Sequence, residues 1–185
     1  MGKATPLTAA ARLMLTSTSH AVGACHQGAA IEGLCLTNLT VRDQATSYTT
    51  FYHNVSSQEN KFANANDALG TLIYVLRAGL GLQVPSAMFF HEVPDSNMAD
   101  LIFKPGYSAN RPVAFDSCGS LYIPGTQNNT VSPPEYYEPE LKVKNWYICL
   151  TRFSYLYESL VWKIGVTGEP QNPTCQSVGV QRVWV

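Results

Sequence analysis

The chain contains few charged residues and none of the common motifs of enzymes that use a nucleotide or a metal. Charged side chains make up 14% of the 185 residues and the formal net charge is −1, whereas an average globular domain is about a quarter charged. The 12 lysines and arginines are spread evenly and form no basic stripe that would neutralise phosphates, so nucleic acid is not an expected partner. A G-x-S-x-G elbow, a glycine-rich phosphate loop, an H-E-x-x-H pair and a dinucleotide fingerprint are all absent. We therefore expect neither a cofactor nor a metal site.

Long apolar segments are also absent. The longest runs, at 69–76 and 84–90, are far shorter than the roughly 20 residues that a membrane-spanning helix needs, so we expect no membrane span. The first residues, Met1 to Pro6, lack the apolar region of a signal peptide, and the later run 9–15 is interrupted by Arg12. Because other features point to secretion, we expect the sequence to begin after a removed signal peptide.

Five cysteines are present, without any C-x-x-C spacing and without histidines at zinc-finger intervals. In an oxidising compartment an odd number predicts two disulfides and one free thiol, and the spacing leaves the pairing open. The alternative is five reduced cysteines in the core of a cytosolic protein. The cysteines are Cys25, Cys35, Cys118, Cys149 and Cys175.

Three N-x-S/T sequons favour the secretory pathway over the cytosol. They begin at Asn38, Asn54 and Asn128, whereas the triplet at Asn172 is excluded by Pro173. Together with the low charge and the cysteines, they predict a secreted, N-glycosylated and disulfide-bonded protein.

Short apolar and aromatic segments, separated by glycine and proline, follow one another along the chain. This pattern predicts a single all-β domain, an antiparallel β-sandwich or barrel, rather than alternating βα units. We expect loops at 59–67 and, rich in proline, at 125–139. The expected strands are 12–17, 34–39, 45–53, 69–76, 86–91, 101–103, 113–116, 121–123, 145–151, 160–164 and 178–185.

Two histidines are candidate proton donors near pH 6 to 7, namely His26 and His53, because each lies beside turn or aromatic residues. A structural role, as a hydrogen-bonding turn residue or a strand cap, is the alternative for both. A pair of carboxylates suited to glycoside hydrolysis is not indicated by the spacing of the acidic residues between 92 and 116. Hydrolysis of cell-wall polysaccharide is therefore only a remote option.

Aromatic residues are abundant, with ten Tyr, seven Phe and three Trp. Core packing accounts for most of them, but tyrosine and tryptophan inside a β-barrel can also line a cavity and orient one apolar ligand. Arg152 lies in the dense aromatic stretch 146–162 and could bind an oxyanion or stack on a ring, or else lie at the surface. The candidate lining residues are Tyr52, Trp146, Tyr155 and Trp162, with His26 beside them.

Several stretches resemble a group of small secreted fungal proteins of largely uncharacterised function. The matching features are an H-x-G-A turn at 26–29, a W-x-x-C strand at 146–149 and a late cysteine, Cys175, before the final strand; segment 104–122 also contributes. The resemblance spans nearly the whole chain and implies an all-β secreted fold in which Cys149 is bonded to Cys175. The chain departs from the group's pattern at 150–153, where an acidic residue and tryptophans are usual, and in its additional cysteines.

Some proteins of this group resemble cofactor-free cyclases that join a quinone methide to a terpene by hetero-Diels–Alder addition. Such a reaction needs a dry cavity that holds two apolar partners together and a donor that polarises a carbonyl. The density of aromatic residues predicts binding of a hydrophobic small molecule, and the resemblance implies a cyclase. In that case we expect His53 or Arg152 to polarise the carbonyl. The alternative is a non-catalytic secreted or cell-surface interaction glycoprotein.

Overall fold

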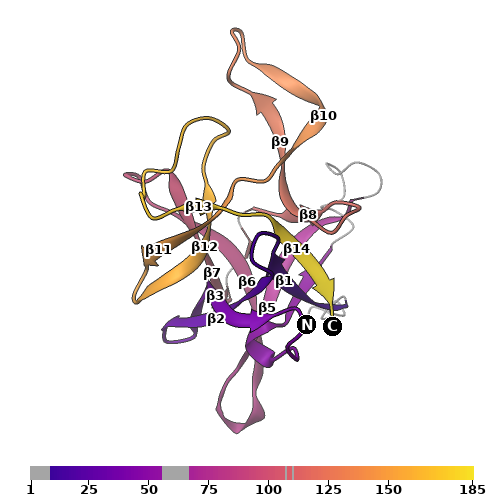
Figure 1. Cartoon of the computed structure of the whole chain (residues 1–185), viewed down its shortest axis with the longest axis vertical. Coiled ribbons are helices and arrows are strands. Elements are labelled where there is room, and N and C mark those ends of the chain that lie inside the picture. Colours follow the sequence, from indigo (N-terminus) through magenta and orange to yellow (C-terminus); the bar gives the residue numbers. More distant parts are fainter. Residues whose placement is uncertain (1–8, 56–66, 107, 110) are drawn as a thin grey trace.

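The chain folds as a single all-β domain built on an eight-stranded antiparallel barrel (Figure 1). The computed structural model describes residues 9–55, 67–106, 108–109 and 111–185, and these contain no α-helix. The predicted fold class is confirmed, and of the two predicted architectures the barrel is the one observed.

Strand pairing closes the barrel into a ring. The order around it is β1–β2–β3–β7–β6–β5–β4 and back to β1, and β12 pairs with both β3 and β7. Every pair is antiparallel. The strands of the ring are β1 (Ala10–Leu15), β2 (His20–Gly28), β3 (Ile31–Thr40), β4 (Phe51–Asn54), β5 (Leu69–Arg77), β6 (Gln83–Glu92), β7 (Met98–Pro105) and β12 (Leu156–Lys163).

Six further strands extend the barrel wall. One group continues from β5 and comprises β8 (Val113–Phe115), β9 (Leu121–Asn128) and β10 (Glu135–Val143), and the β9–β10 hairpin projects from the barrel at the top of Figure 1. A second group continues from β12 and comprises β11 (Trp146–Arg152) and β13 (Gln176–Ser177). The last strand, β14 (Val180–Trp184), pairs with β1. Single 3₁₀ turns occur at η1 (Ser47–Thr49) and η3 (Gly79–Gly81).

The inside of the barrel is packed with side chains. Because alternate residues of a strand point to one face, the apolar alternation of β12 directs Leu160 and Trp162 inward, as the sequence predicts. Phe51 of β4 stacks on Phe103 of β7, with ring centroids 5.6 Å apart. Trp146 packs edge-on against Trp162 at 4.6 Å and is completely buried. These rings belong to one buried cluster, which forms the core of the domain.

Arg12, which interrupts the first apolar run, is buried in β1. Its Nη1 donates to the carbonyl of Asp43 and its Nη2 to the carbonyl of Thr40, both at 2.7 Å. A buried charge is tolerated when it is hydrogen-bonded, and here it fixes the segment that follows β3.

Two predicted segments have a different structure, and β2 lies where no strand is predicted. The predicted loop at 125–139 is mostly hairpin, because β9 continues to Asn128 and β10 begins at Glu135. Proline is accepted there since β10 is an edge strand with a shifted register between Tyr136 and Leu141. The predicted strand at 45–53 is a 3₁₀ turn followed by a short strand, because Thr46 and Thr49 form a capping box. The loop predicted at 59–67 lies, except for Asp67, outside the described residues.

Two disulfides form, as the cysteine count predicts. Cys149 is bonded to Cys175, the pair implied by the family resemblance, and Cys25 is bonded to Cys35 across the β2–β3 hairpin. Cys118 is the remaining thiol and is exposed.

Trp146 ties β11 to β9, because its Nε1 donates to the carbonyl of Leu121 at 2.7 Å. We predict that Trp146→Phe lowers the free energy of unfolding by about 3 kcal/mol, since the smaller ring leaves a void and the carbonyl loses its donor. Urea denaturation measures this loss. The control is Trp162→Phe, which shortens the neighbouring ring and should cost less; an equal cost would contradict a stabilising role for the indole hydrogen bond.

Candidate functional site

The predicted ligand-lining residues do not meet in one cavity. Trp146 and Trp162 pack in the core, whereas Tyr52 is half-buried on β4. The side chain of His26 is 61% exposed and lies 3.6 Å from the carboxylate of Glu32 on the neighbouring strand. Its ring is 5.9 Å from that of Tyr155, which is 51% exposed.

The hairpin between β11 and β12, which carries Arg152 and Tyr155, is fixed by Gln27. The buried Oε1 of Gln27 accepts hydrogen bonds from the backbone N–H groups of Ser154 and Tyr155 at 3.1 and 3.0 Å. Arg152 itself is exposed at the end of β11. This hairpin is therefore fixed at the surface, where Tyr155 lies beside His26.

His53 is the predicted residue that does line a cavity. It is buried on β4, and its Nε2 donates to the carbonyl of Val113 at 3.1 Å, which requires the proton to be on Nε2 because a carbonyl only accepts. Its ring meets Phe115 edge-on, with centroids 5.1 Å apart. Gly70 permits this position, since a Cβ there would lie 2.9 Å from Nε2 and 2.4 Å from the carbonyl oxygen of Asn54.

The cavity beside His53, which we name the Arg182 pocket, has a volume of about 260 Å³. It lies where β4, β8 and β14 approach one another. Its lining includes His53, Asp67, Phe115, Asp116, Ser117 and Arg182.

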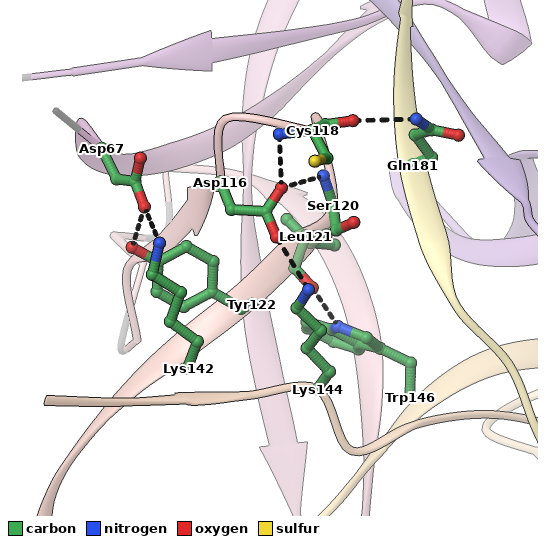
Figure 2. A network of polar contacts seen from close by, with 10 residues as sticks. All are labelled: Asp67, Asp116, Cys118, Ser120, Leu121, Tyr122, Lys142, Lys144, Trp146 and Gln181. Atoms are coloured by element: carbon green, nitrogen blue, oxygen red, sulfur yellow. Dashed lines mark hydrogen bonds and ion pairs between the residues drawn. The ribbon is translucent and has the colours of Figure 1, made fainter.

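Asp67, the first carboxylate of the Arg182 pocket, is neutralised by a lysine. Its Oδ2 accepts hydrogen bonds from Lys142 Nζ at 2.5 Å and from the hydroxyl of Tyr122 at 3.0 Å (Figure 2). Burial and the neighbouring Asp67 carboxylate raise the pKa of Tyr122 well above its usual range, so its hydroxyl remains a donor.

Asp116, the second carboxylate, is held by three donors in Figure 2. Its Oδ2 accepts from Lys144 Nζ at 2.7 Å, and its Oδ1 accepts from the backbone N–H groups of Cys118 and Ser120 at 3.0 and 2.9 Å. Burial alone would raise the pKa of Asp116, but Lys144 and the two backbone donors outweigh it and lower the pKa. The turn 116–120 is consequently a rigid wall of the pocket.

A second cavity, which we name the Ile148 groove, has a volume of about 290 Å³. It lies between the barrel strands β1 and β3 and the outer strands β11 and β13. Its apolar floor comprises Leu15, Leu36, Ile148 and Val178, and its polar rim comprises Ser17, Thr18, Glu158, Thr174, Gln176 and Ser177.

The outer wall of the Ile148 groove is covalently fixed. Cys149, which lines it, is bonded to Cys175. Thr174 Oγ1 also accepts the backbone N–H of Leu150 at 2.9 Å, and Asn172 Nδ2 donates to the carbonyl of Leu150 at 3.0 Å. The disulfide therefore positions a cavity wall as well as joining two strands.

The three sequon asparagines occupy different surroundings. Asn38 is exposed on β3, Asn54 is half-buried at the end of β4, and Asn128 begins the turn between β9 and β10. Asn128 Oδ1 accepts hydrogen bonds from the backbone N–H and the hydroxyl of Thr130 at 3.0 and 2.6 Å. The excluded Asn172 makes the same two contacts with Thr174, at 3.0 and 2.7 Å.

Comparisons with known proteins add no relative: no protein family, no curated protein and no solved structure matches the chain. Among the described residues, no three His, Cys, Asp or Glu side chains are grouped so as to hold a metal ion. Nor does the described part of the chain contain a helix that is long and apolar enough to cross a membrane.

Sequence reasoning missed Arg182, Lys142 and Ile148. The one usable signal was the alternation of the final strand, which places Arg182 and Trp184 on the same face. Lys142 and Asp67 are 75 residues apart, so no local pattern relates them.

We predict that Lys142→Met lowers the free energy of unfolding by about 2 kcal/mol, because it leaves the charge of Asp67 buried without its cation. The Asp67 side chain is 5% exposed and that of Lys142 is 36% exposed. Chemical denaturation at neutral pH measures the loss, and adding Asp67→Asn should restore most of it.

The matched control is Lys144→Met, which breaks a pair whose lysine is 43% exposed and should cost less than about 1 kcal/mol. Equal losses for the two lysines, or no recovery in the double variant, would contradict the importance of burial at Asp67.

Proposed function

We propose that this protein is secreted and binds a hydrophobic small molecule in the Ile148 groove. The observation that carries the proposal is the groove itself: its floor is apolar, its rim is polar and its volume is about 290 Å³. Small-molecule sites have this composition and begin at about 300 Å³.

The Ile148 groove borders the aromatic core of the barrel. Its floor residues Leu15 and Ile148 belong to the same buried cluster as Trp146 and Trp162. The floor of the Ile148 groove offers four aliphatic side chains to the body of a ligand, and the rim offers hydroxyl, amide and carboxylate groups to its polar end. We therefore infer an amphipathic ligand with an apolar body.

The rigid wall supports tight binding of a small ligand. Ordering a binding site on association costs free energy, and a preformed site avoids that cost. The Cys149–Cys175 disulfide and the contacts of Leu150 with Asn172 and Thr174 hold the groove in shape without a ligand.

Cyclisation of the bound molecule by hetero-Diels–Alder addition remains a proposal that rests on the family resemblance alone. The two predicted catalytic residues, His53 and Arg152, do not line the Ile148 groove. Chemistry in the groove would therefore use a donor from its rim. Without such chemistry, the protein would be a carrier.

The test is titration with Nile red, a neutral apolar dye. We predict that the unmodified protein binds the dye and that Ser177→Trp, which fills the mouth of the groove, weakens binding at least about tenfold. Thr126→Trp is the control, since it places the same ring on an exposed position of β9 outside the groove. Absence of dye binding, or equal weakening by both variants, would contradict ligand binding in the Ile148 groove. Either result would favour a non-catalytic interaction protein.

Secretion is supported by two formed disulfides, which persist in oxidising compartments. We predict that protein secreted from a fungal host carries a glycan on Asn128 and none on Asn172, although both side chains make the same contacts with the threonine two residues on. Digestion with an N-glycosidase followed by peptide mass mapping reads both positions.

Pro173→Ala serves as the matched variant, because it converts 172–174 into a sequon and should add a glycan there. An unglycosylated Asn128 in the secreted protein would count against this proposal.

A further inference from the structure

Arg182 is a cation held by aromatic rings. Its guanidinium carbon lies 4.5 Å from the ring centroid of Phe115 and 4.1 Å from that of Trp184. No carboxylate in the described part of the chain forms an ion pair with it. Arg111 provides the contrast, since its guanidinium lies 5.4 Å from the ring of Phe90 but also binds Glu92 at 2.8 Å.

The other charges of the Arg182 pocket are matched. Asp67 is paired with Lys142, and Asp116 with Lys144. Once these two ion pairs are formed, Arg182 is the charged side chain of the lining that has no ion-pair partner among the described residues. Burial lowers the pKa of Arg182, but a guanidinium stays charged at any physiological pH. The pocket favours an anion.

The position of Arg182 is fixed before any ligand binds. Its backbone N–H donates to the carbonyl of Gly119 at 2.8 Å, and Gln181 Nε2 donates to the carbonyl of Cys118 at 2.8 Å, as Figure 2 shows for the second contact. Gly119 has a φ of +80°, which a residue with a side chain rarely adopts. The turn 116–120 and β14 thus form one rigid unit.

The remaining walls of the pocket include two aromatic rings. Phe115 and His53 meet edge-on at an interplanar angle of 86°, and Ser117 adds a hydroxyl group. A guanidinium binds a carboxylate through two parallel hydrogen bonds in one plane. A ligand held in this way places its body against the two rings.

We propose that the Arg182 pocket binds the carboxylate of a small planar aromatic acid, with Arg182 as its anion-binding residue and the rings of Phe115 and His53 as its walls. This site shares no lining residue with the Ile148 groove. Ligand binding in the Arg182 pocket is therefore independent of ligand binding in the Ile148 groove.

The experiment is an NMR titration of the folded protein with benzoate, followed through the backbone amides of the turn 116–120 and of β14. We expect saturable shifts there, and weaker binding of acetate and of inorganic phosphate, which lack the ring. Arg182→Gln should weaken benzoate binding at least tenfold. Arg182→Lys keeps the charge but loses the planar donor pair. Its affinity for benzoate should therefore lie between those of the unmodified protein and Arg182→Gln.

The control is Arg111→Gln, which removes the other ring-stacked arginine, bound to Glu92, and should leave benzoate affinity unchanged. The proposal is overturned if Arg182→Gln binds benzoate as tightly as the unmodified protein, if both arginine variants weaken it equally, or if acetate binds as tightly as benzoate. If Arg182→Lys binds benzoate as tightly as the unmodified protein, the planar guanidinium is not what recognises the carboxylate, and this part of the proposal is overturned. The backbone amide spectrum of Arg182→Gln away from the turn 116–120 and β14 should match that of the unmodified protein, which confirms that the variant is folded.

Discussion

Closure of the barrel around its own aromatic side chains is the constraint on which the rest of the structure depends. The ring of antiparallel pairs satisfies the backbone hydrogen bonds of its strands, and its interior is filled by residues such as Trp146, Trp162 and Phe103. The same cluster includes Leu15 and Ile148, so the Ile148 groove borders this core. The cavities described above lie where additional strands meet the barrel.

Both candidate sites lie at such junctions, and each is made rigid by a different means. The Ile148 groove is bounded by β11 and β13, which the Cys149–Cys175 disulfide joins. The Arg182 pocket is bounded by the turn 116–120, which Asp116 holds through its backbone donors and Lys144. The groove is apolar at its base, whereas the lining of the pocket includes Arg182, which has no ion-pair partner among the described residues. The two sites consequently suit ligands of different chemistry.

Local patterns were sufficient for the fold and insufficient for the sites. Alternation identified most strands and correctly placed Leu160 and Trp162 on one inward face, and the resemblance supplied the Cys149–Cys175 pair. Alternation does not say whether an inward face lines a cavity or fills a core, and two residues assigned to a cavity wall, Trp146 and Trp162, pack against each other in the core. The partners of Asp67 and Arg182 come from distant strands, and only the closed topology brings them together.

The most direct test of a ligand-binding barrel is native mass spectrometry of the protein secreted from a fungal host, before and after denaturation. The account predicts a native mass that exceeds the denatured mass by one small apolar molecule, on a chain with two disulfides. The Ser177→Trp variant should carry no such bound molecule under the same conditions. Identical native and denatured masses after mild purification, or a bound molecule that Ser177→Trp retains, would contradict binding in the Ile148 groove.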